Sequence, residues 1–473
     1  MHSLVAIALL FAAVDGLQEP RLVYPRLLQE RSHEGKLVME IDDQLTLNLE
    51  KASIAAPQLR VLKGGEESMT VPYDGNEIND KLYQDGKQFA TVAVEENGTI
   101  AQLKGLVGPS HRIEPLPAME RSDSGLIPHM IYEIEQMEMN DKALSFVENE
   151  KYPVFSARNG GRVPDEVVVE VFFVLDHPHY RHFKNIKDAL MYICIMMNSA
   201  NLRYIDVHNP RVKLMVTGAE QPSGEEYVRG TSELLADSDT LKQLKIYAGE
   251  KKSQFGNPDI VFLLSGRDVI TESKGKWDKN GLGVGYVSGV CSEYFVALGE
   301  DKPGLYTGMI TLTHELAHVL GAVHDGEGPY SQVSGHPGAK ACPWDDGFVM
   351  SYVNKDARHQ IFSPCSVRQI EYVLGRKGQQ CWDVASGGYN MSTQYPGNKD
   401  IIDAICKTVY PDKQVESEMI SPRGDECKLR CQYKERKGRY ITTYYIDKDA
   451  PDFAPCGYGK ACIRGHCVRP WRR

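Results

Sequence analysis

Hydrophobic residues follow two different patterns along this chain, and each pattern predicts a different kind of strand. Residues 37–41 and 45–49 alternate apolar and polar positions, which predicts short strands with one buried face. Residues 167–175 (VVVEVFFVL) are almost continuously β-branched or aromatic, which is typical of a central strand buried on both faces. Further strands are expected at 212–217 and 260–264, and helices at 180–201 and 238–249. Strands that alternate with helices predict an α/β layer with a mixed or parallel sheet.

The apolar residues at the N-terminus predict that the protein is secreted. Leu4–Val14 is an eleven-residue apolar run, too short to span a bilayer but suited to the core of a signal peptide. Small residues follow it, so residues 1–16 are expected to be a signal peptide that is cleaved near Gly16. No later run approaches eighteen apolar residues, so the mature protein is expected to be secreted and extracellular. Two glycosylation sequons, at Asn97 and Asn390, suit the same route.

The cysteines are unevenly distributed along the chain. None of the eleven lies before Cys194, and ten of them follow residue 290. A late cluster of this kind in an exported chain predicts a disulfide framework. Six cysteines lie in residues 383–473, which we expect to form a small disulfide-rich module with three bridges. Six cysteines allow fifteen pairings, and the sequence does not choose among them.

The charged residues distinguish an acidic N-terminal part from a basic C-terminal part, and the net charge argues against a nucleic-acid partner. The net charge is −10, so a nucleic-acid partner is not expected, because phosphate binding requires a basic surface. Residues 17–163 are acidic, and their last part, 119–163, is expected to be a loosely ordered connector with a protease-accessible stretch at 158–162 (RNGGR). Residues 383–473 instead carry 16 Lys and Arg against 12 Asp and Glu, a local charge of +4.

A glycine-rich segment lies at residues 281–289 (GLGVGYVSG). No Gly-Lys-Ser/Thr follows it, so it is not a phosphate-binding loop. We expect an edge strand, to which a peptide can add as one more strand of the sheet.

The strongest signal for chemistry is the segment 313–325 (THELAHVLGAVHD). His314 and His318 are four residues apart, so on a helix they share a face and can bind one ion. Gly321 can end that helix with a left-handed turn, and His324 follows three residues later. Three neutral imidazoles with an open position are the catalytic arrangement for zinc. Only about 0.03 His-Glu-x-x-His matches are expected by chance in a chain of this composition. A metal site therefore explains the motif much better than a chance pair of histidines does.

Glu315, beside the first of these histidines, is expected to be the catalytic base. Zinc lowers the pKa of a bound water, and a carboxylate can take its proton and pass it to the leaving amine. Zinc also polarises the scissile carbonyl, so we expect a secreted zinc-dependent endopeptidase. The alternative is a cysteine-rich binding protein or toxin with the protease fold as scaffold, which the intact Glu315 disfavours. A thermolysin-like exopeptidase is disfavoured because His324 already takes the place of its third ligand, a glutamate.

The zinc segment resembles the extended motif of the metzincin metalloproteases. Asp325, after the third histidine, is similar to the reprolysin (adamalysin) branch, which includes ADAM and ADAMTS proteases. Residues 348–352 (FVMSY) resemble the methionine turn of this clan, in which Met350 would lie beneath the imidazoles without ligating. Tyr352 stands at the spacing where astacins and serralysins place an extra tyrosine ligand, so its ligation to zinc is left open. The layout is also similar, more faintly, to the secreted salivary reprolysins of ticks.

This resemblance covers residues 17–382 and implies a domain order. A β-rich propeptide is expected at 17–163 (including HMIY at 129–132), followed at 164–382 by an α/β zincin domain with a mixed five-stranded sheet and an active-site helix. Residues 383–473 resemble the cysteine-rich part of ADAMTS-type proteins.

The resemblance also implies disulfides Cys291–Cys381 and Cys342–Cys365, which leaves Cys194 as a buried free thiol. Reprolysin propeptides usually block zinc with a cysteine, but residues 17–163 contain none. Latency, if present, must therefore come from covering the cleft or from another ligand.

Two weaker clusters complete the list. His177, His179 and His182 are expected in a solvated loop or helix start. Asp237 and Asp239 are candidates for a structural Ca²⁺, although the remaining oxygen ligands of a calcium loop are missing. The expected partners are protein substrates of the extracellular matrix or plasma, and the enzyme is expected to be monomeric.

Overall fold

A computed structural model of the 473-residue chain describes residues 19–29, 36–63, 69–97, 100–137, 163–273, 276–279, 281–383, 399–420, 426–438, 440–451, 454–457, 460–463 and 465–468. The expected signal peptide, the stretch 158–162 and Asn390 lie outside the described residues.

The centre of the molecule is a mixed sheet built on the predicted buried strand. This strand, β12 (Glu166–Leu175), is buried along almost its whole length and pairs in parallel with strands on both sides. Four strands from the same region join it, namely β13 (Arg211–Glu220), β15 (Ile260–Ser265), β19 (Val296–Glu300) and β18 (Gly283–Gly285). Among these five strands only β18 pairs antiparallel, and it forms one edge of the sheet, as expected for the glycine-rich segment.

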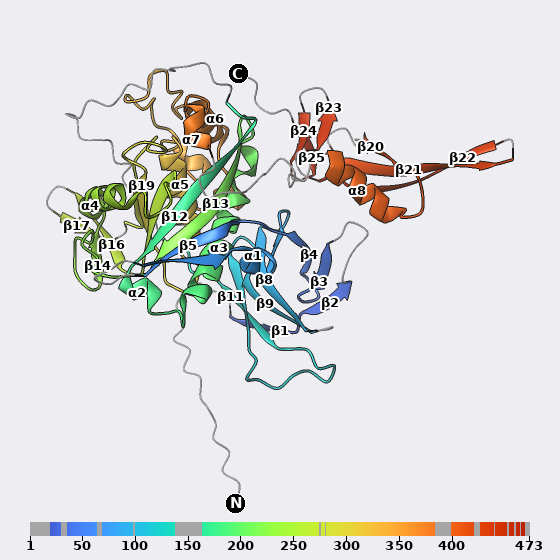
Figure 1. Ribbon diagram of the computed structural model, residues 1–473, viewed down its shortest axis with the longest axis horizontal. Coiled ribbons are helices and arrows are strands. Elements are labelled where there is room, and N and C mark those ends of the chain that lie inside the picture. The colour runs from blue at the N-terminus through green and yellow to red at the C-terminus, as the bar shows by residue number, and fades with distance from the viewer. Residues whose placement is uncertain are drawn as a thin grey trace, which may run out of the picture.

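Two more strands of this sheet come from residues that precede residue 163. Strand β5 (Ala55–Lys63) pairs in parallel with β13, and β6 (Met69–Asp74) pairs antiparallel with β5. The sheet therefore has seven strands in the order β18-β19-β15-β12-β13-β5-β6, and Figure 1 shows β5 beside β13. The predicted propeptide and catalytic region thus share one sheet.

The remaining N-terminal strands form a second, nine-stranded antiparallel sheet in the order β1-β11-β10-β9-β8-β7-β4-β3-β2. Its strands are β1 (Arg21–Val23), β2 (Arg26–Gln29), β3 (Leu37–Glu40), β4 (Thr46–Lys51), β7 (Leu82–Asp85), β8 (Ala90–Asn97), β9 (Ile100–Leu106), β10 (His111–Pro115) and β11 (His129–Glu133). Strand β11 lies in the interval that we expected to be loosely ordered, so that expectation is wrong for residues 129–133. His129 is fully buried there, and its Nε2 accepts a hydrogen bond from the Leu103 amide at 2.9 Å.

The helices differ from the sequence prediction mainly at their ends. The helix expected at 180–201 is two helices, α2 (His177–Tyr180) and α3 (Ile186–Asn201), because Asn185 caps the second one. The other helices of the region are α4 (Asp237–Lys251), α5 (Met309–Val319), α6 (Pro364–Leu374) and α7 (Gln379–Trp382), and α1 (Asn76–Asn79) follows β6. Three short strands, β14 (Leu234–Ala236), β16 (Asp268–Ser273) and β17 (Lys276–Asp278), form a separate small sheet.

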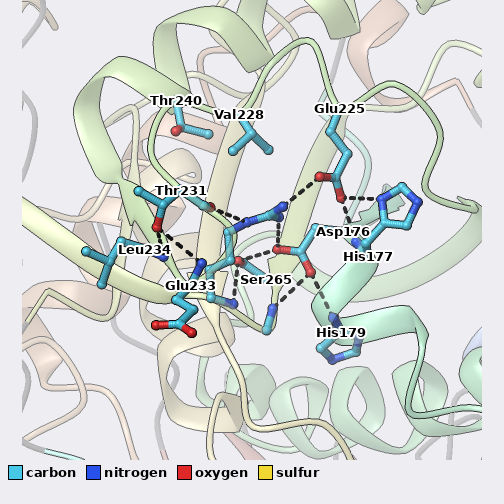
Figure 2. A network of polar contacts seen from close by, with 12 residues as sticks. Asp176, His177, His179, Glu225, Val228, Thr231, Glu233, Leu234, Thr240 and Ser265 are labelled. Atoms are coloured by element: carbon cyan, nitrogen blue, oxygen red, sulfur yellow. Dashed lines mark hydrogen bonds and ion pairs between the residues drawn. The ribbon is translucent and has the colours of Figure 1, made fainter.

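A buried polar network fixes the carboxyl end of β12, as Figure 2 shows. The Asp176 carboxylate accepts hydrogen bonds from the Ser265 hydroxyl at 2.6 Å and the Arg267 guanidinium at 2.8 Å, and it also caps α2. Arg267 further binds Glu225 at 2.6 Å. His179 is fully buried, with its Nε2 3.0 Å from the Asp301 carboxylate. The helix start was therefore expected correctly, but the solvated surroundings of His179 were not.

The C-terminal module consists of helix α8 (Lys399–Val409) and two three-stranded sheets. Strands β20 (Glu416–Ile420), β21 (Lys428–Lys437) and β22 (Tyr440–Asp449) form the larger one, and β23 (Pro455–Gly457), β24 (Lys460–Ile463) and β25 (His466–Val468) form the smaller one. Three disulfides join the module: Cys406–Cys431, Cys427–Cys462 and Cys456–Cys467. Among the described residues, no helix is both long and apolar enough to cross a membrane.

Candidate metal centre

Helix α5 places the first two histidines of the motif on one buried face. Its apolar residues pack into the main core, and His314, Glu315 and His318 are also fully buried. The helix ends before Gly321, which has a φ of +117°. A Cβ at Gly321 would lie only 2.4 Å from Val373 Cγ2, so both the backbone angle and the space require glycine there. This turn brings His324 back toward the helix.

The three imidazoles meet at their Nε2 atoms. His324 Nε2 lies 3.3 Å from His314 Nε2 and 3.2 Å from His318 Nε2. Two donor nitrogens of a tetrahedral zinc site, each about 2.05 Å from the ion, are separated by about 3.3 Å. Neutral nitrogens that present lone pairs to one another at this distance repel unless a cation lies between them. The donor set and its spacing therefore fit Zn²⁺.

The other ring nitrogen of each histidine has a partner that orients the ring. Nδ1 of His314 lies 2.8 Å from the Val349 carbonyl oxygen, and Nδ1 of His318 lies 2.7 Å from the Ala322 carbonyl oxygen. A carbonyl only accepts hydrogen bonds, so these Nδ1 atoms carry the proton and the Nε2 lone pairs face the metal position. His324 Nδ1 contacts a carboxylate instead: Glu327 Oε1 is 3.3 Å away, and this hydrogen bond lowers the pKa of Glu327.

Glu315 lies against the glycine-rich edge strand. A Cβ at Gly283 would lie 2.8 Å from Glu315 Cγ, and one at Gly285 would lie 3.0 Å from the Glu315 carbonyl oxygen. The two glycines of β18 therefore let the strand approach the catalytic helix closely. The sequence predicts an edge strand at these glycines, but no local pattern in it links them to Glu315.

The residues of the expected methionine turn contact the histidine segment. Met350 is fully buried in the main core, and its carbonyl oxygen accepts a hydrogen bond from the Asp325 amide at 3.0 Å. Burial raises the pKa of Asp325 to about 6, while hydrogen bonds from Ser363 and Ser366 oppose the shift. The Tyr352 hydroxyl lies 3.0 Å from His324 Nε2, so it reaches the metal-facing side of the site.

Two disulfides hold the segments below the site, and they are the pairs that the resemblance implies. Cys291 is bonded to Cys381, and Cys342 to Cys365. Cys194 is a buried free thiol within α3, and burial raises its pKa, so it is not a reactive group.

The candidate calcium residues do not meet in the structure. Asp237 accepts hydrogen bonds from the Thr271 hydroxyl, at 2.5 Å, and from the Ser238 amide, whereas Asp239 pairs with Lys242. Structural calcium stays a prediction.

Known proteins with similar sequences support the geometric interpretation. Residues 165–363 match a family model, Reprolysin_5, described as metallo-peptidase family M12. The chain is 26% identical over 398 residues to the venom metalloproteinase antarease of Tityus serrulatus, a match that covers 80% of this chain and 98% of the relative. A venom metalloproteinase of Olivierus martensii is 26% identical and covers 80% of this chain and 95% of the relative. A protein of Bombyx mori named as similar to a disintegrin and metalloproteinase with thrombospondin motifs is 25% identical, covering 66% of this chain and 46% of the relative.

The fold and the histidine triad, together with these similarities, define a metallopeptidase domain. The chain carries a reprolysin-type metzincin domain and is a metalloendopeptidase, so its substrates are proteins.

Proposed function

We propose that this protein is a secreted zinc endopeptidase in which His314, His318 and His324 hold the metal and Glu315 acts as general base and acid. The observation that carries the proposal is the convergence of three oriented Nε2 atoms, 3.2 and 3.3 Å apart, beside a buried glutamate. When bound, zinc would supply a Lewis acid that polarises the scissile carbonyl and acidifies water.

The protein's own groups then perform the proton transfers. Glu315 takes a proton from the attacking water and delivers it to the leaving amine, which a carboxylate near the reacting atoms can do. The backbone carbonyls of Val349 and Ala322 keep the imidazole rings in one orientation throughout. Tyr352, with its hydroxyl 3.0 Å from His324 Nε2, is a candidate for an additional ligand or for a hydrogen-bond donor to the substrate carbonyl.

Substrate binding is proposed to use the free edge of β18. This strand is the last one of its sheet and runs beside Glu315, so a peptide that pairs with it would pass the catalytic groups in an extended conformation. Main-chain pairing of this kind is independent of side chains, which suits an enzyme that cleaves within protein chains.

The same proposal includes the domain order and the export of the protein. We propose a signal peptide at 1–16, a propeptide at 17–163, the protease domain at 164–382 and a cysteine-rich domain at 383–473, in a monomer glycosylated at Asn97 and Asn390. Five disulfides among the described residues favour an oxidising compartment. We also predict that the substrates are proteins of the extracellular matrix or plasma. The similarity to the salivary reprolysins of ticks likewise stays a prediction.

Replacing the catalytic base tests the mechanism. Glu315→Ala should keep the fold and bind one zinc ion per chain, while kcat for a protein substrate falls by at least about 100-fold, because the general base is lost. Metal analysis and circular dichroism would accompany the kinetics. Glu371→Gln is the control, because Glu371 is half-buried and accepts hydrogen bonds from the His208 and Asn209 amides, away from the three histidines.

Full activity of Glu315→Ala would reject the mechanism. A different outcome would favour the alternative of a binding protein with a protease scaffold. In that case the wild-type protein with bound zinc would cleave no protein, but residues 383–473 would bind a ligand.

A further inference from the structure

The hairpin β5–β6 is joined to the protease sheet by backbone hydrogen bonds. The Val216 amide donates to the Ile54 carbonyl at 2.8 Å, and the Gln221 amide donates to the Leu62 carbonyl at 2.9 Å. After a shift of register between Val216 and Gly218, residues 218–220 of β13 pair with residues 60–62 of β5, with Ala219 opposite Val61. The hairpin thus covers the edge of β13, which would otherwise present unpaired backbone groups.

Side chains of β5 enter the protease core on both faces of the sheet. Val61 belongs to the same buried cluster as the catalytic helix, whereas Leu62 belongs to the cluster around α4 and β19. Both side chains are almost completely buried. Removing these apolar side chains from water stabilises the association, so this strand is an integral part of the core.

The protease region is shaped to receive this strand. A Cβ at Gly218 of β13 would lie 2.1 Å from the Arg60 carbonyl oxygen, and one at Gly256 would lie 2.4 Å from Arg60 Nε. Glycine at both positions leaves the space that the backbone and side chain of Arg60 occupy.

A second contact lies on helix α3, which the N-terminal sheet covers. Asn198 Nδ2 donates to Gln84 Oε1 at 2.9 Å and to Thr91 Oγ1 at 3.1 Å. Leu82 and Leu106 pack in the same buried cluster as α3. The helix is buried on nearly all sides because the sheet of the protease lies on one side and these propeptide strands on the other.

By contrast, the contacts of the propeptide's last described residues are polar and exposed. Lys302 pairs with Glu135 at 2.7 Å, with both side chains more than 40% exposed, and Asn354 contacts Gln136. Solvent screens an ion pair as exposed as this one, so it contributes little to stability. Their partners, Lys302 and Asn354, precede α5 and follow the methionine turn, respectively. Glu135 and Gln136 can therefore leave the region of the active site at little cost in free energy.

We infer that the edge of β13 and the outer face of α3 form a permanent docking surface for the chain's own residues 19–137, which stay bound as a non-covalent subunit after the chain is cut between residues 137 and 163. Cleavage would release the weakly held end at 135–137, beyond the buried Ile134, and leave the hairpin β5–β6 in the sheet. The inference concerns assembly and does not depend on catalytic activity.

The test uses the full chain with Glu315→Ala to prevent self-digestion, and with residues 158–162 replaced by a recognition sequence for a site-specific protease. After complete cleavage, size-exclusion chromatography in native buffer should give one peak that contains both fragments. No cysteine precedes Cys194, so co-elution cannot come from a disulfide between the fragments. Separate peaks, with the 163–473 fragment soluble and folded, would overturn the inference.

A pair of variants tests whether the hairpin is the anchor. In the cleaved protein, Leu62→Ala should raise the dissociation constant of the two fragments by about 30-fold or more, because a buried leucine is lost. Gln58→Ala is the matched control on the exposed side of the same strand and should leave the constant unchanged. Equal affinity for Leu62→Ala and Gln58→Ala would show that β5 does not hold the propeptide.

Discussion

The catalytic centre and the C-terminal module are stabilised in opposite ways. Around the three histidines, two large clusters of buried side chains surround the sheet, and the active-site helix is buried on every side. Among the described residues, the C-terminal module has one small cluster, in which five of the nine buried residues are cysteines. Its long hairpin β21–β22, visible in Figure 1, carries several exposed hydrophobic side chains.

The size of the core determines whether the ionisable side chains of each region are buried or lie at the surface. The catalytic region buries ionisable groups, and burial raises the pKa of Glu300 to about 7 and lowers the pKa of Lys377 to about 7. The module keeps its ion pairs at the surface, as in Arg430–Asp447. A large core can enclose polar groups that have partners, whereas a small one depends on covalent bonds and leaves its side chains facing outward.

Removing a module disulfide should give the largest effect. Cys427→Ser with Cys462→Ser opens a bridge with a sequence separation of 35 residues, and we expect the module to lose about 2–5 kcal/mol of stability. Cleavage of a short peptide should be unchanged, because the catalytic core is separate. Limited proteolysis and calorimetry would detect the unfolded module. A parallel loss of peptide hydrolysis would show that the module supports the catalytic core.

The buried Glu300 should make the stability of the catalytic region fall as pH rises. Its folded pKa of about 7 lies above the ordinary value of 4.5, so the protonated form is favoured by folding, and this contribution is lost between about pH 4.5 and 7. Glu300→Gln should remove that slope and raise stability at pH 8 by at most about 3 kcal/mol. Urea unfolding at pH 5 and pH 8 would measure it. The exposed Glu293→Gln is the control, and an unchanged slope in Glu300→Gln would contradict the assignment.

The smallest effect is expected from the exposed side of the module. Tyr440, Ile441 and Tyr445 are 80%, 69% and 59% exposed on β22, and we predict that they bind protein substrates. Replacing all three with Ser should lower cleavage of a large protein by about tenfold, as expected for aromatic anchors, with unchanged cleavage of a short peptide. Thr442→Ser on the same strand is the control. A truncation after Trp382 should reproduce the effect, most clearly at low salt. Equal losses on both substrates would leave the module as structural support.

Local patterns in the sequence predicted the parts of this protein that depend on neighbours along the chain. The four-residue spacing of His314 and His318 requires only helical geometry, and the apolar run at 167–175 requires only burial on two faces. The central strands and the active-site helix were therefore predicted within a few residues of their ends. Errors arose where a cap decided the boundary, as at Asn185 before α3.

Tertiary structure alone decided the contacts between distant segments. No local pattern links His314 to the Val349 carbonyl that orients its ring, or His179 to Asp301. The pairing of the six module cysteines is likewise decided by the tertiary structure. The same holds for β5, whose sequence gives no sign that it pairs with a strand about 160 residues later. Any exposed edge of matching length could accept it, and the glycines at 218 and 256 select this one by the space they leave.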